Sequence, residues 1–202
     1  MAKVLVINSS VRSDDSISRE LTARLADRIE VDNNEISHRD LTGDIHLISE
    51  QSLSAVAKAS EDRSSEERDL ASLADALIEE LELADYLIIG SPMYNFGPAA
   101  SLKAWADLVA RSKRTFTYTD AGPAGLLKIK KAFVIAVTGG TAVGSNIDFM
   151  TPWLKHFLTF IGISNIEMIT ADGIYGPSGA ENIRHAKETI DGLTLKGVKN
   201  EH

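Results

Sequence analysis

The chain alternates short apolar runs with helical patterns, and this alternation limits its fold more than any other feature of the sequence. Each of four runs rich in aliphatic and β-branched residues is followed by a polar or glycine-containing turn. Runs of this length are typical of parallel strands that are buried on both faces of a sheet. The expected strands cover residues 3–7, 85–89, 131–137 and 166–170. Strands that alternate with helices predict an α/β fold.

Helical patterns fill the intervals between these strands. Apolar residues recur at three- and four-residue steps in residues 16–29 and 70–81, and residues 99–111 and 181–195 also have helical patterns. Residues 35–40 alternate and predict a further strand near the sheet edge. The sequence therefore predicts a doubly wound sheet of five parallel strands in the order 2-1-3-4-5, with helices on both faces, as in flavodoxin-like folds.

One segment breaks this rhythm. Residues 42–68 contain a short expected helix at 47–59, a charged loop, and a Ser64–Glu67 pair with the spacing of a capping box. No change in composition marks a second domain, and 202 residues are an ordinary length for one domain. We therefore expect one domain over residues 1–202, with an inserted excursion at about 42–68.

Composition and charge exclude several functional classes. The chain has no cysteine, which excludes disulfides and cysteine-bound metal sites. Its net charge of −8 argues against nucleic acid and anionic membrane surfaces as partners. No apolar run approaches a signal-peptide core or a membrane span. The histidines are scattered, so no metal site is expected. A cytoplasmic protein that acts on small molecules is the expectation.

The turn after the first strand is rich in hydroxyl groups. Residues 8–18 contain no glycine, which excludes the glycine-rich loops of dinucleotide and nucleoside triphosphate binding. Hydroxyls and backbone amides at a helix N-terminus can hold a terminal monophosphate. The candidate ligands are Ser10, Ser16, the backbone amide of Ile17, and Ser18. The alternative is that Ser16 or Ser18 only caps the helix.

The turn after the strand at 85–89 carries aromatic rings and one amide. Met93, Tyr94, Asn95 and Phe96 lie there, and the Asn95 carboxamide can pair with the carbonyls and ring nitrogens of a flat heteroaromatic ring. The alternative is that Tyr94 and Phe96 only pack in the core at the start of the next helix.

The turn after the strand at 131–137 carries a glycine pair, Gly139-Gly140. Paired glycines permit a tight turn or the close approach of a flat ligand, and a plain turn is the alternative. In the expected strand order this turn lies beside the other two, at the carboxyl edge of the sheet. The three turns together predict one site for a flavin or a similar planar, phosphorylated ligand.

Over nearly its whole length the chain resembles the FMN-dependent NADH azoreductase and quinone reductase family. The resemblance rests on the Met-Tyr-Asn-Phe element at 93–96, on Phe-x-x-Phe-Ile-Gly-Ile at 157–163, and on shared segments at 3–10, 107–111 and 173–177. It implies that FMN is held by Ser10, Ser16, Ile17, Ser18, Met93, Tyr94, Asn95, Phe96, Val137, Thr138, Gly139 and Gly140. In many members serine-arginine precedes the glycine pair, whereas this chain has Val137-Thr138.

The resemblance also implies the reaction. NADH or NADPH would reduce FMN, and a quinone or azo compound would then take two electrons in a ping-pong scheme. No catalytic acid or base is expected, because the cofactor carries the chemistry. Tyr118, and Phe160 from a partner subunit, would line the substrate pocket; for Phe160 the alternative is ordinary core or dimer packing.

A homodimer is expected from the helix at 152–161, which carries more apolar surface than one sheet face can cover. Thr151 and Pro152 predict its start and Gly162 its end, and residues 118–125 are expected to form a loop. Two other functions remain open at this point, a flavodoxin-like electron carrier and a non-enzymatic ligand-binding module. The insertion and the aromatic loop at 116–118 argue against the carrier.

Overall fold

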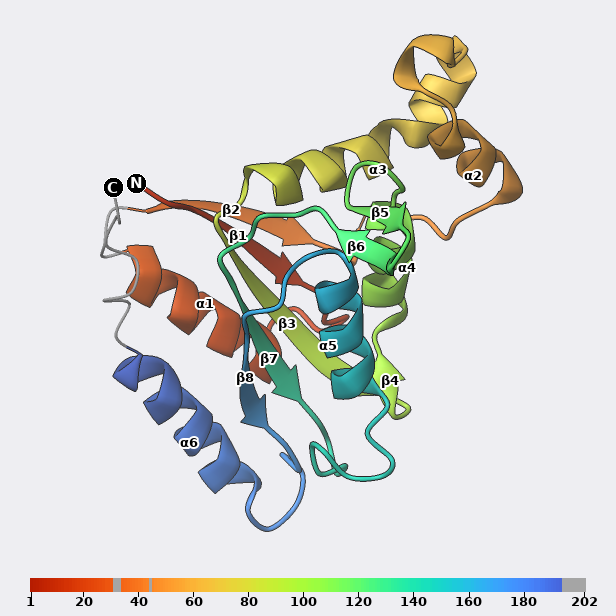
Figure 1. Cartoon of the computed structure of the whole chain (residues 1–202). Coiled ribbons are helices and arrows are strands. Elements are labelled where there is room, and N and C mark those ends of the chain that lie inside the picture. Colours follow the sequence, from red (N-terminus) through yellow and green to blue (C-terminus); the bar gives the residue numbers. More distant parts are fainter. Residues whose placement is uncertain (31–33, 44, 194–202) are drawn as a thin grey trace.

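The predicted five-stranded parallel sheet is confirmed in the computed structural model, which describes residues 1–30, 34–43 and 45–193. The strand order β2-β1-β3-β7-β8 corresponds to the predicted 2-1-3-4-5 (Figure 1). The strands are β1 (Lys3–Asn8), β2 (Glu35–Asp40), β3 (Tyr86–Tyr94), β7 (Lys131–Val137) and β8 (Ile166–Ala171).

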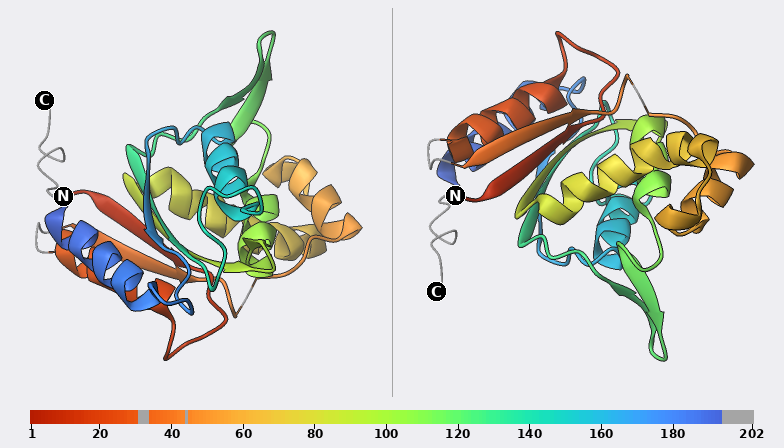
Figure 2. Two further views of the ribbon diagram at one scale, coloured as in Figure 1. Left: turned by 90° about the horizontal axis from the view of Figure 1, so that it is seen from below. Right: turned by 90° about the horizontal axis from the view of Figure 1, so that it is seen from above.

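Helices cover both faces of this sheet, as predicted (Figures 1 and 2). One face is covered by α1 (Ile17–Glu30) and α6 (Gly179–Gly192), and the other by α3 (Ser65–Leu83), α4 (Ala100–Val109) and α5 (Met150–Phe160). The last helix ends at Gly192, whereas the prediction extended to residue 195; residues 194 and 195 lie outside the described residues.

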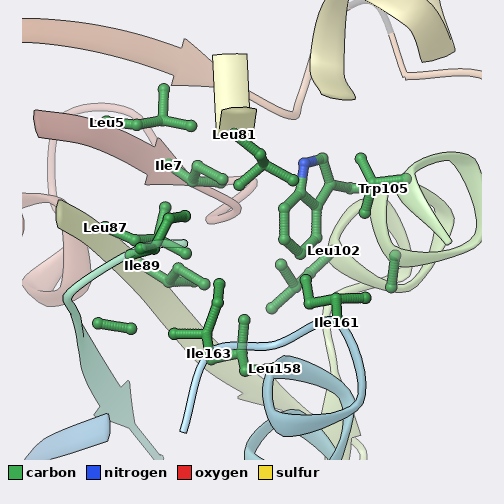
Figure 3. Close-up of a cluster of buried hydrophobic side chains, with 14 of the residues drawn as sticks. Leu5, Ile7, Leu81, Leu87, Ile89, Leu102, Trp105, Leu158, Ile161 and Ile163 are labelled. Carbon is green, nitrogen blue, oxygen red and sulfur yellow. The ribbon is translucent and has the colours of Figure 1, made fainter. Parts of the chain in front are cut away.

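Two apolar cores form because successive strand residues point to opposite faces. Val4 and Val6 of β1 belong to the core under α1 and α6, while Leu5 and Ile7 belong to the core under α3, α4 and α5. Figure 3 shows Leu5 and Ile7 on the side of the sheet that faces Trp105 of α4. This burial on both faces explains why the strand residues form a continuous apolar run rather than an alternating one.

Helix α3 shows how sequence signals set an element. Ser64 and Glu67 form the predicted capping box, in which the Ser64 side chain accepts from the Glu67 amide and the Glu67 side chain accepts from the Ser64 amide. The apolar stripe from Ala71 to Leu81 is buried, but Leu70, which we placed in the stripe, is 42% exposed.

The excursion between β2 and α3 contains α2 (Glu50–Ala57) and the short 3₁₀ helix η1 (Ser60–Asp62). Helix α2 stands away from the sheet at one end of the molecule (Figure 1). Arg63, 6% exposed, anchors the segment by donating to the Asp75 carboxylate of α3 at 2.6 Å.

Strand β3 runs through residues that we expected to form a turn. Gly90 lies inside the strand, where a Cβ atom would come within 2.9 Å of Thr22 Cγ2 and 3.1 Å of Asn8 Oδ1. Glycine is needed there because α1 packs closely on the strand, not because the chain turns. The turn comes later, where β4 (Gly97–Pro98) pairs back on Met93 and Tyr94.

The segment at 118–125 is a hairpin rather than the expected loop. Strands β5 (Phe116–Thr119) and β6 (Gly122–Gly125) pair antiparallel and project from the body of the molecule (Figure 2). Proline is tolerated in edge strands, and both strands of this hairpin are edge strands, so Pro123 is compatible with it.

The predicted start of α5 is wrong, whereas its end is confirmed. The helix begins at Met150, and the amides of Met150 and Thr151 donate to Asp148 Oδ1 at 3.1 and 3.0 Å, so Asp148 replaces Thr151 as the capping residue. Gly162 follows the helix with a φ of 108°, in the left-handed region that favours glycine.

Candidate functional site

Three turns leave the same edge of the sheet side by side. Strand β3 is the neighbour of both β1 and β7. Asn8 at the end of β1 is in register with Gly90, and Val137 at the end of β7 is in register with Pro92. The turns that follow β1, β3 and β7 therefore meet at the carboxyl edge, where doubly wound folds bind their ligands.

The first turn places two buried hydroxyls at the start of α1. Ser16 and Ser18 are 8% and 1% exposed, and their Oγ atoms lie 3.2 Å apart. The Ser16 carbonyl accepts the Glu20 amide at 3.0 Å, which makes Ser16 the residue before the first helical turn. The amides of that turn have no carbonyl partner inside the helix, and the Arg19 amide donates to Ser16 Oγ at 3.4 Å, so Ser16 also caps the helix. Hydroxyls and amides together form a donor set suited to a phosphate.

Tyr94 connects the first turn with the second. Its hydroxyl lies 3.4 Å from Ser10 Oγ and accepts the Val11 amide at 3.3 Å. Ser10 itself is buried. The phenol of Tyr94 therefore reaches the hydroxyl-rich turn and lies beside Ser10.

The second turn is strained at its tip. Asn95 and Phe96 have φ values of 48° and 69°. Asparagine tolerates this left-handed region, but a bulky phenylalanine there costs free energy. The Phe149 amide donates to the Phe96 carbonyl at 3.1 Å and holds the turn. Asn95 is exposed, so its amide faces outward from the turn rather than into the core.

The third turn offers backbone rather than side chains. Val137 is buried in the core, and Thr138 Oγ1 donates to the Thr141 carbonyl and accepts the Gly173 amide at 3.0 Å. A Cβ at Gly139 would meet the Tyr175 ring at 3.1 Å. Because the Val137 and Thr138 side chains are committed to the protein, this turn has its backbone to offer a ligand.

A groove of about 560 Å³ adjoins the second turn. It is lined by Tyr94, Asn95, Gly97, Pro98, Ala100, Lys103, Phe149 and Trp153. Its wall is mostly apolar and aromatic, and its one lining lysine is paired with Asp107 at 2.6 Å. A planar organic molecule fits this chemistry better than an ion does.

Two residues that line this groove, Phe149 and Trp153, were not among the predicted site residues. Phe149 is 61% exposed immediately before α5, and Trp153 lies one turn into that helix, where its ring stacks on Phe157 at 5.8 Å between centroids. The available signal was an aromatic pair at a four-residue spacing; we assigned Trp153 to the dimer surface of the helix at 152–161 and gave Phe149 no role.

The Asp148 carboxylate fixes Phe149 in place. It accepts the Gly144 amide at 2.8 Å in addition to the α5 amides. Burial alone would raise its pKa, but the hydrogen bonds from Gly144 and from Thr151 outweigh burial, so the pKa of Asp148 lies below its usual value. The charged cap therefore persists at neutral pH.

Tyr118 and Phe160 lie together but away from this groove. The Phe116 ring packs on both, with centroid distances of 5.5 Å to Tyr118 and 4.5 Å to Phe160. Phe160 ends α5, whereas Phe149 precedes it, and an 11-residue helix is about 16 Å long. Within one chain Phe160 is thus about a helix length from the second turn, and neither Tyr118 nor Phe160 lines the groove.

Within residues 1–30, 34–43 and 45–193, no group of three or more histidine, aspartate or glutamate side chains could hold a metal ion. None of the helices in that part of the chain combines the length and the hydropathy that crossing a membrane requires.

Comparison with known proteins gives consistent results. The family described as flavodoxin-like fold matches residues 2–193. An FMN-dependent NADH:quinone oxidoreductase of Erythrobacter litoralis is 46% identical over 193 residues, which are 95% of this chain and 98% of the relative. An FMN-dependent NADH:quinone oxidoreductase 1 of Colwellia psychrerythraea is 40% identical over 189 residues, covering 93% of this chain and 98% of the relative.

Solved structures share the fold. An azoreductase from Bacillus anthracis str. Sterne superimposes with a TM-score of 0.85 at 23% identity, covering 94% of this chain and 97% of that one. An FMN-dependent NADH-azoreductase from Bacillus anthracis str. Ames Ancestor, solved in complex with FMN, gives a TM-score of 0.83 at 24% identity over 94% and 96% of the two chains.

Proposed function

The chain belongs to the flavodoxin-like fold family and to the FMN-dependent NADH:quinone oxidoreductases within it, and we propose that it uses FMN to pass two electrons from NADH to quinones. The observation that carries the placement of FMN is the meeting of three turns at the carboxyl edge, next to an apolar groove.

The phosphate end of FMN fits the first turn. The Ser16 and Ser18 hydroxyls converge at the N-terminus of a 14-residue helix, where the helix dipole favours an anion. Ser10 approaches from the turn and is linked to Tyr94. Together they would bind the phosphate without a lysine or a glycine-rich loop.

The ring end of FMN fits the other two turns. The exposed Asn95 amide and the backbone of Gly139 and Gly140 offer polar groups for the edge of a heteroaromatic ring. A Cβ at Gly140 would meet nothing within 4 Å, so the approach to this turn is open. Val137 and Thr138 would contribute backbone only.

Substrate binding is assigned to the groove. When bound, FMN supplies the redox chemistry that accepts hydride and reduces the acceptor. The chain's own groups bind, orient and exclude water, and Phe149 and Trp153 supply flat apolar walls for a quinone or a nicotinamide. Use of NADPH and reduction of azo compounds belong to the same proposal.

A homodimer completes the proposed pocket. Tyr118 is 74% exposed on a hairpin that projects from the body of the molecule (Figure 2), and the rings of Tyr118 and Phe160 both pack on Phe116. Neither side chain lines the chain's own groove, so in this proposal they contribute to the groove of a partner subunit. The predicted single domain and cytoplasmic location remain predictions.

Flavin retention tests this proposal. The purified protein is incubated with FMN or FAD and desalted, and the absorbance spectrum is recorded. We expect one FMN per chain and a preference for FMN over FAD. A spectrum without flavin absorbance contradicts the proposal, and retained FMN without NADH oxidation indicates an electron carrier instead.

A further inference from the structure

The side chain of Arg19 connects three separate segments at the hydroxyl-rich turn. Its Nε donates to the Arg12 carbonyl at 2.8 Å, and Nη2 donates to the Ser10 carbonyl at 2.8 Å. Nη1 and Nη2 also donate to the two Asp40 carboxylate oxygens, at 2.7 and 3.0 Å. One guanidinium thereby joins the first turn of α1, the turn after β1 and the end of β2.

The partner of Arg19 is itself held in place. Asp40 ends β2, and its Oδ1 accepts the Thr42 amide at 2.9 Å and the Thr42 hydroxyl at 2.7 Å. The hydrogen bond from Arg19 is the main cause that lowers the pKa of Asp40 to about 2. The pair is therefore ionised and geometrically fixed at neutral pH.

The turn that Arg19 holds is linked to the rest of the molecule by Arg19 and by the Tyr94 hydroxyl, which contacts Ser10 and Val11. Residues 11–15 are exposed, and the turn contains no helix or strand. Ser10 lies on this turn, whereas Ser16 and Ser18 lie at the start of α1. A phosphate that contacts all three serines needs the turn to keep a fixed position relative to the helix.

We infer that Arg19, clamped by Asp40, is a positioning residue for the cofactor phosphate, because it fixes Ser10 against the helix start that carries Ser16 and Ser18. This inference rests on the proposed function. Arg19 itself does not contact the phosphate, because its guanidinium already donates to two backbone carbonyls and one carboxylate.

The same helix offers a matched control. Arg24 of α1 makes an equivalent fork with Asp191 of α6, with Nε–Oδ1 and Nη2–Oδ2 distances of 2.8 and 2.6 Å. That pair ties α1 to α6, and its two carboxylate contacts lie away from the turn after β1. Loss of this pair removes a comparable ion pair without releasing Ser10.

The test compares FMN with riboflavin, which lacks the phosphate. Dissociation constants for both are measured by flavin fluorescence on wild type, Arg19→Met, Arg19→Lys and Arg24→Met. We expect Arg19→Met to weaken FMN binding about tenfold and riboflavin binding by less than about twofold. Arg19→Lys should recover only part of the loss, because an ammonium lacks the planar fork. Arg24→Met should leave the ratio of FMN affinity to riboflavin affinity unchanged.

The possible outcomes separate this inference from the function on which it rests. A folded Arg19→Met that keeps the wild-type ratio overturns the role of Arg19 and leaves the proposed function intact. A wild type that binds riboflavin as tightly as FMN overturns the phosphate site, and the inference falls with it. If Arg19→Met does not fold, Asp40→Asn takes its place: a reduced ratio supports the clamp, and an unchanged ratio overturns it.

Discussion

At the scale of single residues, the proposed site depends on groups whose partners the structure makes explicit. Ser16 and Ser18 are buried and bonded to each other, whereas the Thr138 hydroxyl is fully used by Thr141 and Gly173. Ser16 and Ser18 were candidates as hydroxyls at a helix start, whereas Thr138 was a candidate only through the family resemblance. The Thr138 hydroxyl joins its own turn to Gly173 in the loop after β8, which is far away in sequence. Only the folded structure therefore separates this hydroxyl from the serine hydroxyls that can meet a ligand.

The serine pair gives the first prediction. Changing Ser16 and Ser18 together to alanine should weaken FMN binding by about tenfold or more, since a hydrogen bond to a charged group contributes about 1.5–3 kcal/mol. Riboflavin binding should be nearly unaffected. Fluorescence titration measures both, and circular dichroism checks the fold. Ser64→Ala, which removes the cap of α3, is the control; equal FMN affinity in the folded double variant would place the phosphate elsewhere.

Asp40 gives a prediction for stability against pH. Its folded pKa of about 2 lies below the unfolded value near 3.9, so its contribution is present above about pH 4 and is lost as pH falls toward 2. Asp40→Asn should therefore cost about 1 kcal/mol at pH 7, discounted because half of the side chain is exposed, and the difference should shrink below pH 4. Urea unfolding at pH 7, 4 and 2.5 measures it. A pH-independent difference would show that the charge is not the cause.

At the scale of elements, the hairpin tip at Asn95 and Phe96 stores strain beside the groove. A phenylalanine with a φ of 69° persists because the surrounding structure holds it. Its position at a candidate ligand site fits the general association of strained backbone with function. The strain is confined to a two-residue turn between paired strands.

Phe96→Gly should therefore stabilise the free protein by less than about 1 kcal/mol, because glycine adopts a positive φ without a steric cost but has more conformational freedom in the unfolded chain. The same change should weaken FMN binding, because it removes one of the side chains expected to contact the cofactor. Asn95→Gly is the matched control, with a smaller gain expected, since asparagine already tolerates this region. Thermal unfolding without flavin gives the stability, and titration gives the affinity. A loss of stability in Phe96→Gly would mean that the ring contributes more by packing than its backbone costs.

The same elements show what a sequence can predict. The strands and their order were predictable because buried parallel strands are short apolar runs and the fold class fixes their arrangement. The extension of β3 through Gly90 was not, because a glycine needed for close helix packing reads locally like a glycine needed for a turn. The start of α5 was missed because Thr151-Pro152 is a strong local signal, whereas Asp148 caps from outside the helix.

Among the candidate site residues, too, some could be predicted from the sequence and others could not. The three turns were predictable because residue type and strand order place them together. Phe149, Trp153 and Arg19 were not, because their roles depend on which loops pack against them. The separation of Tyr118 and Phe160 from the groove also needed the structure, since the length and direction of α5 decide it.

At the scale of the whole molecule, the account predicts a dimer in which each hairpin completes the partner's groove. Tyr118→Ala should raise the KM for a quinone several-fold, because this side chain would line the partner's groove. Flavin content and dimer mass should not change, because the side chain is exposed and lies away from its own groove. Steady-state kinetics and light scattering measure these quantities. A monomer at micromolar concentration that is fully active would show that the pocket needs no partner.

Initial rates of NADH oxidation by the FMN-loaded protein with benzoquinone, at several fixed concentrations of each substrate, test the proposed electron transfer from NADH to quinones. We expect FMN-dependent turnover and parallel double-reciprocal lines, because one site serves donor and acceptor in turn. Loaded protein that does not oxidise NADH would contradict the proposed activity. Intersecting lines would contradict the shared site.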